Sequence, residues 1–125
     1  MKVSAIVAAA GSGVRMGTEV RKQYLILEGV PVLARSLNLF LEHPAVSEVI
    51  VVIPPDEEEA VTALIEAYTP LERISLVPGG STRMASVKNG LARLVNDRGG
   101  LVCIHDAARP LASAALLDRL LAKAA

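Results

Sequence analysis

The chain has 125 residues, of which 52% are hydrophobic and 21% charged, a composition that excludes a disordered or low-complexity protein. Thirteen Lys and Arg residues balance thirteen Asp and Glu residues, and a net charge of zero argues against a nucleic-acid-binding protein, which would carry a basic surplus. We expect one domain, residues 1–125, that buries roughly two-thirds of its unfolded surface.

Cysteine content and the lengths of the apolar runs predict a cytoplasmic protein. Cys103 is the single cysteine, so no internal disulfide can form, as is usual in a reducing compartment. Lys2 and the apolar residues after it imitate a short signal peptide, but they run directly into glycines, so we favour a buried strand. No segment of the sequence approaches the roughly 20 apolar residues that cross a bilayer, and we expect no membrane contact.

The first half of the chain alternates between strand and helix patterns. Val3–Ala8 is a β-branched run typical of a buried strand, and residues 24–30 predict a small hairpin or an extended connection. A helix is predicted between Pro31 and Pro44, followed by a second buried strand, Glu48–Ile53. The apolar positions of that helix, at helical spacing, are Leu33, Leu37, Phe40 and Leu41.

The second half continues the alternation after Pro54-Pro55, with strands predicted at Arg73–Val77 and Leu101–Ile104 and a last helix capped by Ser113. Three further helices carry apolar stripes: Val61, Leu64, Ile65 and Tyr68; Met84, Val87, Leu91, Leu94 and Val95; and Leu116, Leu117, Leu120 and Leu121. The order β-α-β-α-β-α-β-α predicts an α/β fold of three layers, a mostly parallel sheet with helices on both faces.

Open parallel sheets bind ligands beyond the carboxyl ends of their strands, and the first such loop here is rich in small residues. Residues 8–17 contain Arg15, and Lys22 follows shortly after. Glycine-rich loops of this kind suit phosphates, yet neither the P-loop nor the dinucleotide fingerprint fits, because Met16 and Thr18 stand where glycine is required. The alternative is a tight strand-to-helix turn with a solvated arginine.

The loop at residues 78–87 also enters a helix. Its glycines expose backbone groups, and the hydroxyls of Ser81, Thr82 and Ser86 could read the edge of a nucleobase. The alternative is a simple helix N-cap by Ser81 or Thr82.

Asp106 follows an apolar strand, where a carboxylate is costly without a partner. Magnesium held jointly with substrate phosphates is one possible partner, and an ion pair with Arg109 is the other. We expect His105 to be a packed neighbour, Cys103 an inert thiol, and His43 to be explained by the dipole of its helix.

Taken together, four segments resemble the 2-C-methyl-D-erythritol 4-phosphate cytidylyltransferase family. They are residues 9–17, Lys22-Gln23-Tyr24, residues 79–91 (Gly79-Gly80-x-x-Arg83-x-x-Ser86-Val87) and His105-Asp106-Ala107-Ala108-Arg109-Pro110. The resemblance implies a Rossmann-like nucleotidyltransferase fold and transfer of a cytidylyl group from CTP to a sugar-alcohol phosphate, with release of pyrophosphate and with Mg²⁺ as cofactor.

The resemblance also implies roles for individual residues. Arg15 and Lys22 match the basic groups that steady the triphosphate and the transition state. The nucleotide-binding positions implied are Ala9, Ala10, Gly11 and Gly13 along the nucleotide, Gly80, Ser81 and Ser86 around the cytosine, and Asp106, Ala107 and Arg109 toward the ribose and the acceptor. Asp106 is the implied metal ligand.

Some features depart from the family. Arg21 replaces a usual proline, Ala85 stands where the residue is often acidic, and Ser81 replaces a residue that is acidic in some members. Nothing matches the family's second half, which supplies a dimer arm and a further basic residue, and the chain ends at Ala124-Ala125 without a cap. We therefore expect an N-terminal portion of a homodimeric enzyme. Two alternatives stay open: a cytidylyltransferase for another acceptor such as ribitol 5-phosphate, and an inactive nucleotide-binding fragment.

Overall fold

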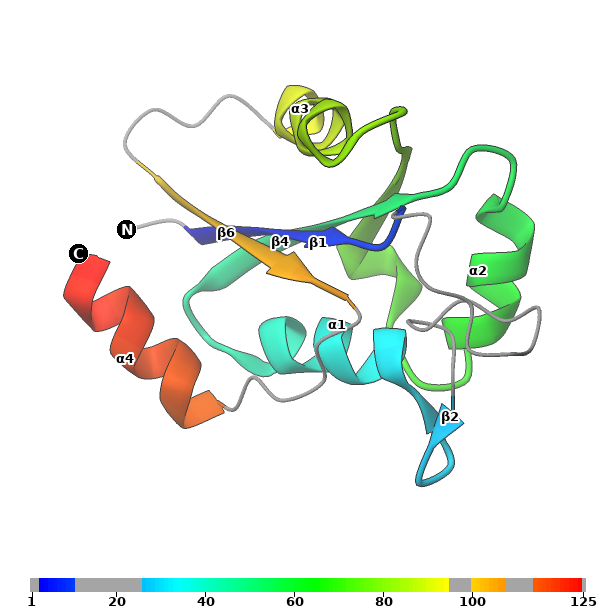
Figure 1. Ribbon diagram of the computed structural model, residues 1–125. Helices are drawn as coiled ribbons and strands as arrows, with labels where there is room; N and C mark the ends of the chain where they lie inside the picture. Colours follow the sequence, from blue (N-terminus) through cyan, green and yellow to red (C-terminus); the bar gives the residue numbers. More distant parts are fainter. Residues whose placement is uncertain (1–2, 11–25, 95–99, 108–113, 125) are drawn as a thin grey trace.

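Four parallel strands form the sheet of the computed structural model, which describes residues 3–10, 26–94, 100–107 and 114–124 (Figure 1). The strands, in spatial order, are β5 (Ile74–Pro78), β4 (Val46–Ile53), β1 (Val3–Ala8) and β6 (Leu101–Asp106). The chain places its strands successively to one side of β1 and then returns to place β6 on the other side. This reversal is a topological switch point, where α/β sheets bind ligands.

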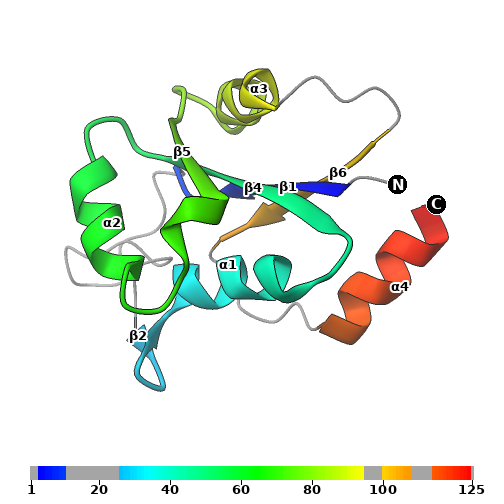
Figure 2. The ribbon, with the colours of Figure 1, turned by 180° about the vertical axis from the view of Figure 1, so that it is seen from behind.

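Helices cover both faces of the sheet, which confirms the predicted three-layer α/β fold. On one face lies α3 (Arg83–Arg93); on the other lie α1 (Val32–Glu42), α2 (Glu58–Ile65) and α4 (Ala114–Ala124), as Figures 1 and 2 show. A short 3₁₀ turn, η2 (Leu71–Arg73), leads into β5. Among the described helices, none has both the length and the apolarity that a membrane span requires.

Two apolar clusters hold these layers together. The larger lies between the sheet and α1, and it includes Leu33, Leu37, Phe40 and Leu41, all the positions predicted for that helix face. The smaller lies under α3 and consists of Ile6, Ile50, Val52 and Val77. Burial of each such side chain stabilises the fold by roughly 1.5–3 kcal/mol, and β1 contributes residues to both clusters.

A tight hairpin precedes α1. The sequence offered a hairpin or an extended connection here, and the hairpin is confirmed. Strands β2 (Ile26–Leu27) and β3 (Val30–Pro31) pair in antiparallel fashion. The two residues between them, Glu28 and Gly29, have φ angles of 52° and 82°. Positive φ at both central positions is the geometry of a type I′ turn, which matches the natural twist of paired strands.

The predicted apolar stripe of α3 holds only in part: Leu94 packs against the smaller cluster and Val87 is half-buried, Val95 lies outside the described residues, and the other two positions are exposed. Met84 is 72% exposed and Leu91 is 42% exposed, whereas the buried residues of this helix are Ser86 and Gly90. A β-carbon on Gly90 would lie 3.0 Å from Ile6 Cγ2, so the absence of a side chain there lets the helix lie close to the sheet. The helix therefore packs through small residues, a pattern that hydrophobic periodicity does not detect.

Two further differences concern element ends. Helix α2 ends at Ile65, and Tyr68, expected on its apolar stripe, is 41% exposed. Strand β6 runs two residues beyond its predicted end and is an edge strand whose Val102 and Ile104 are 41% and 46% exposed, so the expectation of burial on both faces is wrong for this strand. Asp106 is consequently the last residue of a strand and not part of a loop.

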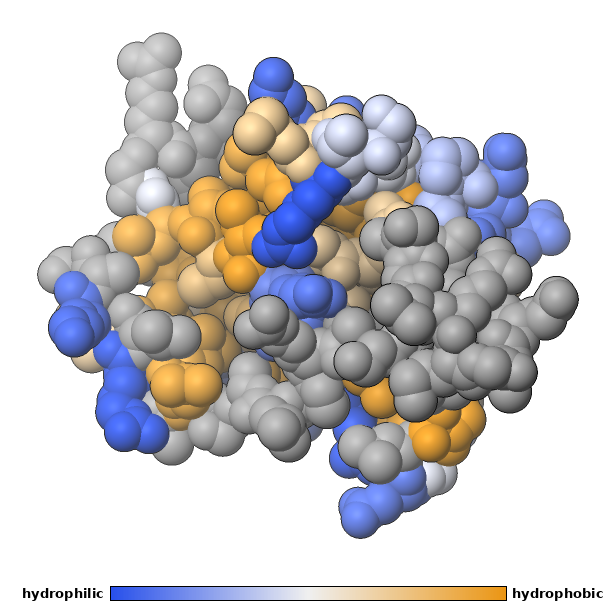
Figure 3. Space-filling model, in the orientation of Figure 1, coloured by the Kyte–Doolittle hydropathy of each residue, from blue (hydrophilic) through white to orange (hydrophobic). Residues whose placement is uncertain are grey.

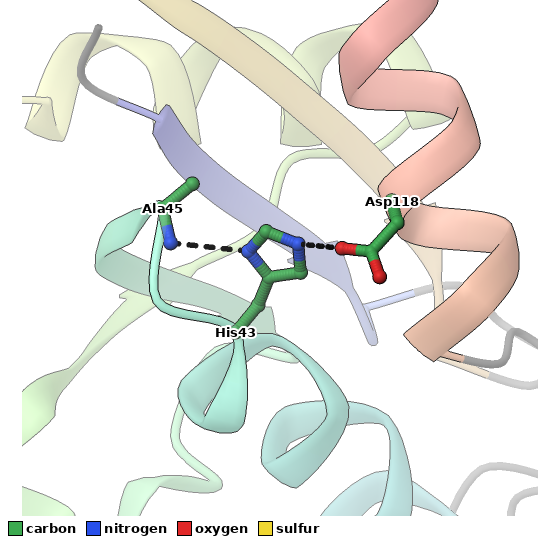
Figure 4. Close-up of polar contacts among 3 residues, drawn as sticks. All are labelled: His43, Ala45 and Asp118. Atoms are coloured by element: carbon green, nitrogen blue, oxygen red, sulfur yellow. Dashed lines mark hydrogen bonds and ion pairs between the residues drawn. The ribbon is translucent and has the colours of Figure 1, made fainter.

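His43 links the end of α1 to α4 (Figure 4). Its Nδ1 accepts a hydrogen bond from the Ala45 N–H at 3.1 Å, and its Nε2 lies 2.5 Å from Asp118 Oδ1. Because Nδ1 is an acceptor, the proton of the neutral ring lies on Nε2 and is donated to the carboxylate. These contacts, rather than the helix dipole, account for His43.

Candidate active site at the carboxyl edge of the sheet

Backbone hydrogen bonds bring the carboxyl ends of all four strands into one edge. The Ala9 N–H donates to Val52 O at 2.7 Å, and the Gly79 N–H donates to Ile53 O at 2.7 Å. On the other side of β1, the Ala107 N–H donates to Ala8 O at 3.0 Å. The parallel ladders thus continue past the strands and place three of the predicted segments side by side.

Close packing joins the first and second of these segments. A β-carbon on Gly79 would lie 2.3 Å from Ala10 Cβ and 2.9 Å from Ser86 Oγ, distances that no real side chain could occupy. Only glycine lets the chain after β5 approach the end of β1 this closely. The predicted nucleotide-binding residues Ala9 and Ala10 therefore lie next to the Gly79-Gly80 turn.

The turn is held to the start of α3 by side-chain hydrogen bonds. Ser86 Oγ accepts from the Gly80 N–H at 3.0 Å, and Thr82 Oγ1 accepts from the Ala85 N–H at 3.0 Å. Thr82 is thus the N-cap of α3, which confirms the capping alternative for this residue and not for Ser81. Ser81 is exposed beside this turn, while Ser86 is only 5% exposed.

An open hollow of about 510 Å³ lies between the start of α3 and the end of β6, and it is lined by Arg83, Ile104, His105 and Asp106. On the face shown in Figure 3, hydrophilic side chains meet a wide hydrophobic area. Strand register pairs Asp106 with Ala8, which points to the same face of the sheet as Ile6, two residues earlier in β1. Ile6 lies under α3, so the carboxylate belongs to the face that α3 covers. An anionic group and a cationic group from distant parts of the chain thus share one hollow.

The neighbours of Asp106 have packing roles. The ring of His105 lies against Phe40, with centroids 5.6 Å apart and planes at 64°, which confirms the expected packed histidine. Cys103 packs against the larger core, and burial raises the pKa of its thiol, which therefore stays protonated near neutral pH, in keeping with an inert thiol. Neither residue offers an activated nucleophile.

Part of the predicted site falls outside the residues that the structure describes, namely Gly11, Gly13, Arg15, Lys22 and Arg109. The structure therefore brings together Ala9, Ala10, Gly80, Ser81, Ser86, Asp106 and Ala107. Both the ion pair between Asp106 and Arg109 and the binding roles of all these residues stay predictions.

Asp106 is the candidate metal ligand. Within the described ranges, no three His, Cys, Asp or Glu side chains form a group that could hold a metal ion. One carboxylate suits Mg²⁺, which commonly takes one or two protein carboxylates and completes its shell with substrate phosphates and water. The donor set fits that cation and does not fit a closed cage such as a structural zinc site.

Sequence reasoning does not single out Arg83, which lines the hollow, although Arg83 belongs to one of the family-like motifs. A signal was available, because Arg83 is the first residue of a helix whose first turn has no acidic residue. A cation at that end opposes the helix dipole, so it weakens the helix unless an anion is bound there.

Comparison with known proteins agrees with this geometry. Residues 3–125 match the family model described as 2-C-methyl-D-erythritol 4-phosphate cytidylyltransferase (IspD). A relative of that name from Pelotomaculum thermopropionicum is 46% identical over 113 residues, covering 90% of this chain and 47% of the relative. Another from Acidobacterium capsulatum is 41% identical over 124 residues, covering 95% and 52%. The chain thus spans about half the length of the curated relatives it matches.

A solved structure supports the same relationship. The crystal structure of 4-diphosphocytidyl-2C-methyl-D-erythritol synthase from Anaerococcus prevotii superimposes with a TM-score of 0.78 at 34% sequence identity. The match covers 98% of this chain and 50% of that protein. The fold that the two share is the Rossmann-like nucleotidyltransferase fold. With a glycine turn, a buried serine and a strand-end aspartate gathered at its switch point, the chain belongs to the 2-C-methyl-D-erythritol 4-phosphate cytidylyltransferase family.

Proposed function

We propose that this chain provides the nucleotide-binding part of an enzyme that transfers a cytidylyl group from CTP to 2-C-methyl-D-erythritol 4-phosphate. A phosphate oxygen of the acceptor attacks the α-phosphorus and forms a new P–O–P bond. The bond between the α-phosphorus and the bridging oxygen of the β-phosphate breaks, and pyrophosphate leaves. This reaction would supply a precursor for isoprenoid synthesis.

One observation carries the proposal. The ends of β1, β5 and β6 meet at the switch point of the sheet, where the Gly79–Ala10 contact and the hollow beside Asp106 lie together. A nucleotide in that position would meet backbone N–H groups and small residues on one side and a carboxylate on the other. Family membership names the reaction, which the topology alone does not.

Transfer needs positive charge where the phosphates gain negative charge. We assign this role to Arg15 and Lys22 by their match to the family motif. At about 4 Å and an effective dielectric near 20, each cation–phosphate contact contributes on the order of 4 kcal/mol before desolvation is subtracted. Fixed cations can stabilise the transition state more than the ground state because the charge on the leaving group rises during the reaction.

We also propose Asp106 as the residue that would hold Mg²⁺. When bound, the cation would neutralise charge on the nucleotide phosphates. The chain's own contribution is to fix one carboxylate at the end of β6, within a strand paired to β1 residue by residue. The expected effect of Asp106→Asn is weaker metal-dependent activity, and an unchanged rate and Mg²⁺ requirement would support a purely structural ion pair.

The relatives named above favour methylerythritol phosphate over ribitol 5-phosphate as the acceptor. A cytoplasmic location remains our proposal on the basis of the lone cysteine, and a homodimer remains a proposal on the basis of the family resemblance. Light scattering on the full-length protein would measure the oligomeric state.

The decisive experiment is pyrophosphate release by the full-length natural protein with CTP and methylerythritol phosphate. We expect turnover, and we expect Arg15→Ala and Lys22→Ala to lower kcat by about 10³–10⁵, the range found for arginine in phosphoryl transfer. Lys123→Ala, an exposed change on α4, is the control and should leave kcat unchanged. Absence of turnover by the unmodified protein would overturn the proposed function, and a loss below tenfold in both variants would overturn the roles of Arg15 and Lys22.

A further inference from the structure

We infer that Arg83 is a substrate-binding residue whose guanidinium binds a phosphate oxygen of the nucleotide in the hollow that it shares with Asp106. The inference rests on the proposed function and adds to it a third cation, which comes from a different segment than Arg15 and Lys22.

Placement is the first argument. Arg83 begins α3, directly after the Gly79-Gly80 turn, while Asp106 ends β6, and both side chains line the same hollow of about 510 Å³. Their positions bracket the carboxyl edge of β1, where the switch point lies. A nucleotide lying across that edge would therefore pass between a carboxylate and a guanidinium.

The local electrostatics are the second argument. The amino end of α3 carries the positive end of the helix dipole, and its first turn contains no acidic residue. Arg83 adds a full positive charge at this point, which costs stability in the free protein. The arrangement becomes favourable when an anion binds, since the guanidinium and the dipole then attract the same charge.

The third argument is that Arg83 has no structural contact to explain it. Within the described residues, its exposed side chain makes no hydrogen bond or ion pair, and the N-cap role belongs to Thr82. Arg73 provides the contrast, because it donates to Leu41 O at 2.7 Å and to Val46 O at 3.3 Å and so ties α1 to the sheet. Arg73 has a structural role, whereas Arg83 is available to a ligand.

The chemistry of the group also suits the task. A guanidinium presents planar N–H donors that match phosphate oxygens, and it stays charged at every physiological pH. Asp106 alone would repel a triphosphate. A cation on the opposite side of the hollow offsets this repulsion and leaves the carboxylate able to hold Mg²⁺.

The test is titration calorimetry on the full-length protein with three probes: CTP, inorganic tripolyphosphate and cytidine. The variants are Arg83→Ala, Arg83→Lys and a matched control, Arg93→Ala, which removes an exposed arginine from the other end of the same helix. We expect Arg83→Ala to weaken CTP and tripolyphosphate binding by about 10–100-fold, the range for a charged hydrogen bond. Arg83→Lys should recover part of the loss, and cytidine binding and Arg93→Ala should stay within about twofold of the unmodified protein.

A stability measurement completes the test. Because Arg83 opposes the dipole of α3, Arg83→Ala should leave Tm unchanged or raise it, whereas loss of a structural residue would lower it. Unchanged tripolyphosphate binding in Arg83→Ala, or an equal loss for cytidine, would overturn the inference. If CTP and tripolyphosphate binding depend on Arg83 but the full-length protein releases no pyrophosphate from CTP with methylerythritol phosphate, the inference stands and the proposed function falls.

Discussion

The hydroxyl oxygen of Ser86 accepts a hydrogen bond from the backbone N–H of Gly80 at 3.0 Å, which fastens the turn after β5 to the first turn of α3. Ser86 is only 5% exposed, so water does not readily replace it as the acceptor. The serine thus holds the glycine turn in place, and any contact it makes with a nucleobase would use the hydroxyl proton or the second lone pair of the oxygen. Its small size also lets α3 lie close to the sheet beside Gly90.

Replacing Ser86 with alanine tests this positioning role. The change removes the acceptor of the Gly80 N–H, and we expect the free energy of unfolding to fall by about 1 kcal/mol, the usual contribution of such a bond. CTP affinity should fall as well, by up to about fivefold if the whole cost falls on the turn. Urea unfolding and calorimetry measure the two effects.

Ser47→Ala is the matched control, because Ser47 Oγ donates to Val3 O at 3.1 Å near the amino ends of the strands. Because Ser47 is exposed, the change should lower stability by no more than Ser86→Ala does, without any effect on CTP binding. Equal effects of both variants on CTP affinity would show that Ser86 acts only through overall stability.

The contact between Gly79 and Ala10 gives a second prediction. Gly79→Ala would place a methyl group 2.3 Å from Ala10 Cβ, and we expect a loss of about 1–3 kcal/mol in unfolding free energy together with weaker nucleotide binding. The double variant Gly79→Ala with Ala10→Gly removes the blocking methyl and should recover part of both losses. No recovery in the double variant would place the clash elsewhere, for example at Ser86 Oγ, 2.9 Å from the new carbon.

Sequence patterns predicted the fold because its strands and most of its helices follow simple periodicities. Strand β1 and the apolar face of α1 are buried as predicted, since β-branched runs and i, i+4 spacing report burial directly. Helix α3 is the exception. It packs through Ser86 and Gly90, which hydrophobicity scales treat as neutral, so hydrophobic periodicity wrongly places the exposed Met84 and Leu91 in the core.

The position of the site was predictable from the sequence, but the contacts between its residues were not. Topology indicated the carboxyl edge, and motif resemblance indicated Gly80 and Asp106. The hydrogen bond from Gly80 to Ser86 and the hollow shared by Arg83 and Asp106 depend on how α3 lies over the sheet. Arg83 and Asp106 are distant in sequence, so no local pattern encodes the hollow that they share, and the shorter-range bond between Gly80 and Ser86 depends on the conformation of the turn.

A pH dependence is expected from Cys103. Burial raises the pKa of its thiol in the folded state, so the folded protein binds this proton more tightly than the unfolded chain. Its contribution to stability is therefore fully present at neutral pH and is lost as the pH rises past the ordinary thiol pKa of about 8.5 and on through the folded-state value. Urea unfolding between neutral and alkaline pH measures the effect, and Cys103→Ala should flatten the alkaline decline. An equally steep decline in that variant would assign it to other groups.

The link from α1 to α4 through His43 and Asp118 gives the last prediction. Asp118 is 67% exposed and His43 only 10% exposed in their side chains, so the two variants should differ in cost. Asp118→Ala removes the exposed acceptor of the His43 hydrogen bond and should lower the unfolding free energy by less than about 1 kcal/mol. His43→Ala also leaves the Ala45 N–H without its acceptor and should cost about 1–3 kcal/mol.

Amide hydrogen exchange separates local from global effects of this link. Loss of the Asp118 contact should speed exchange in α4 more than in β1, because that contact joins the helix to the end of α1. Lys123→Ala, on the same helix, is the control and should leave the exchange pattern unchanged. A double-mutant cycle of His43→Ala and Asp118→Ala then measures the pair itself, and additive costs would show that the two side chains do not stabilise each other in solution.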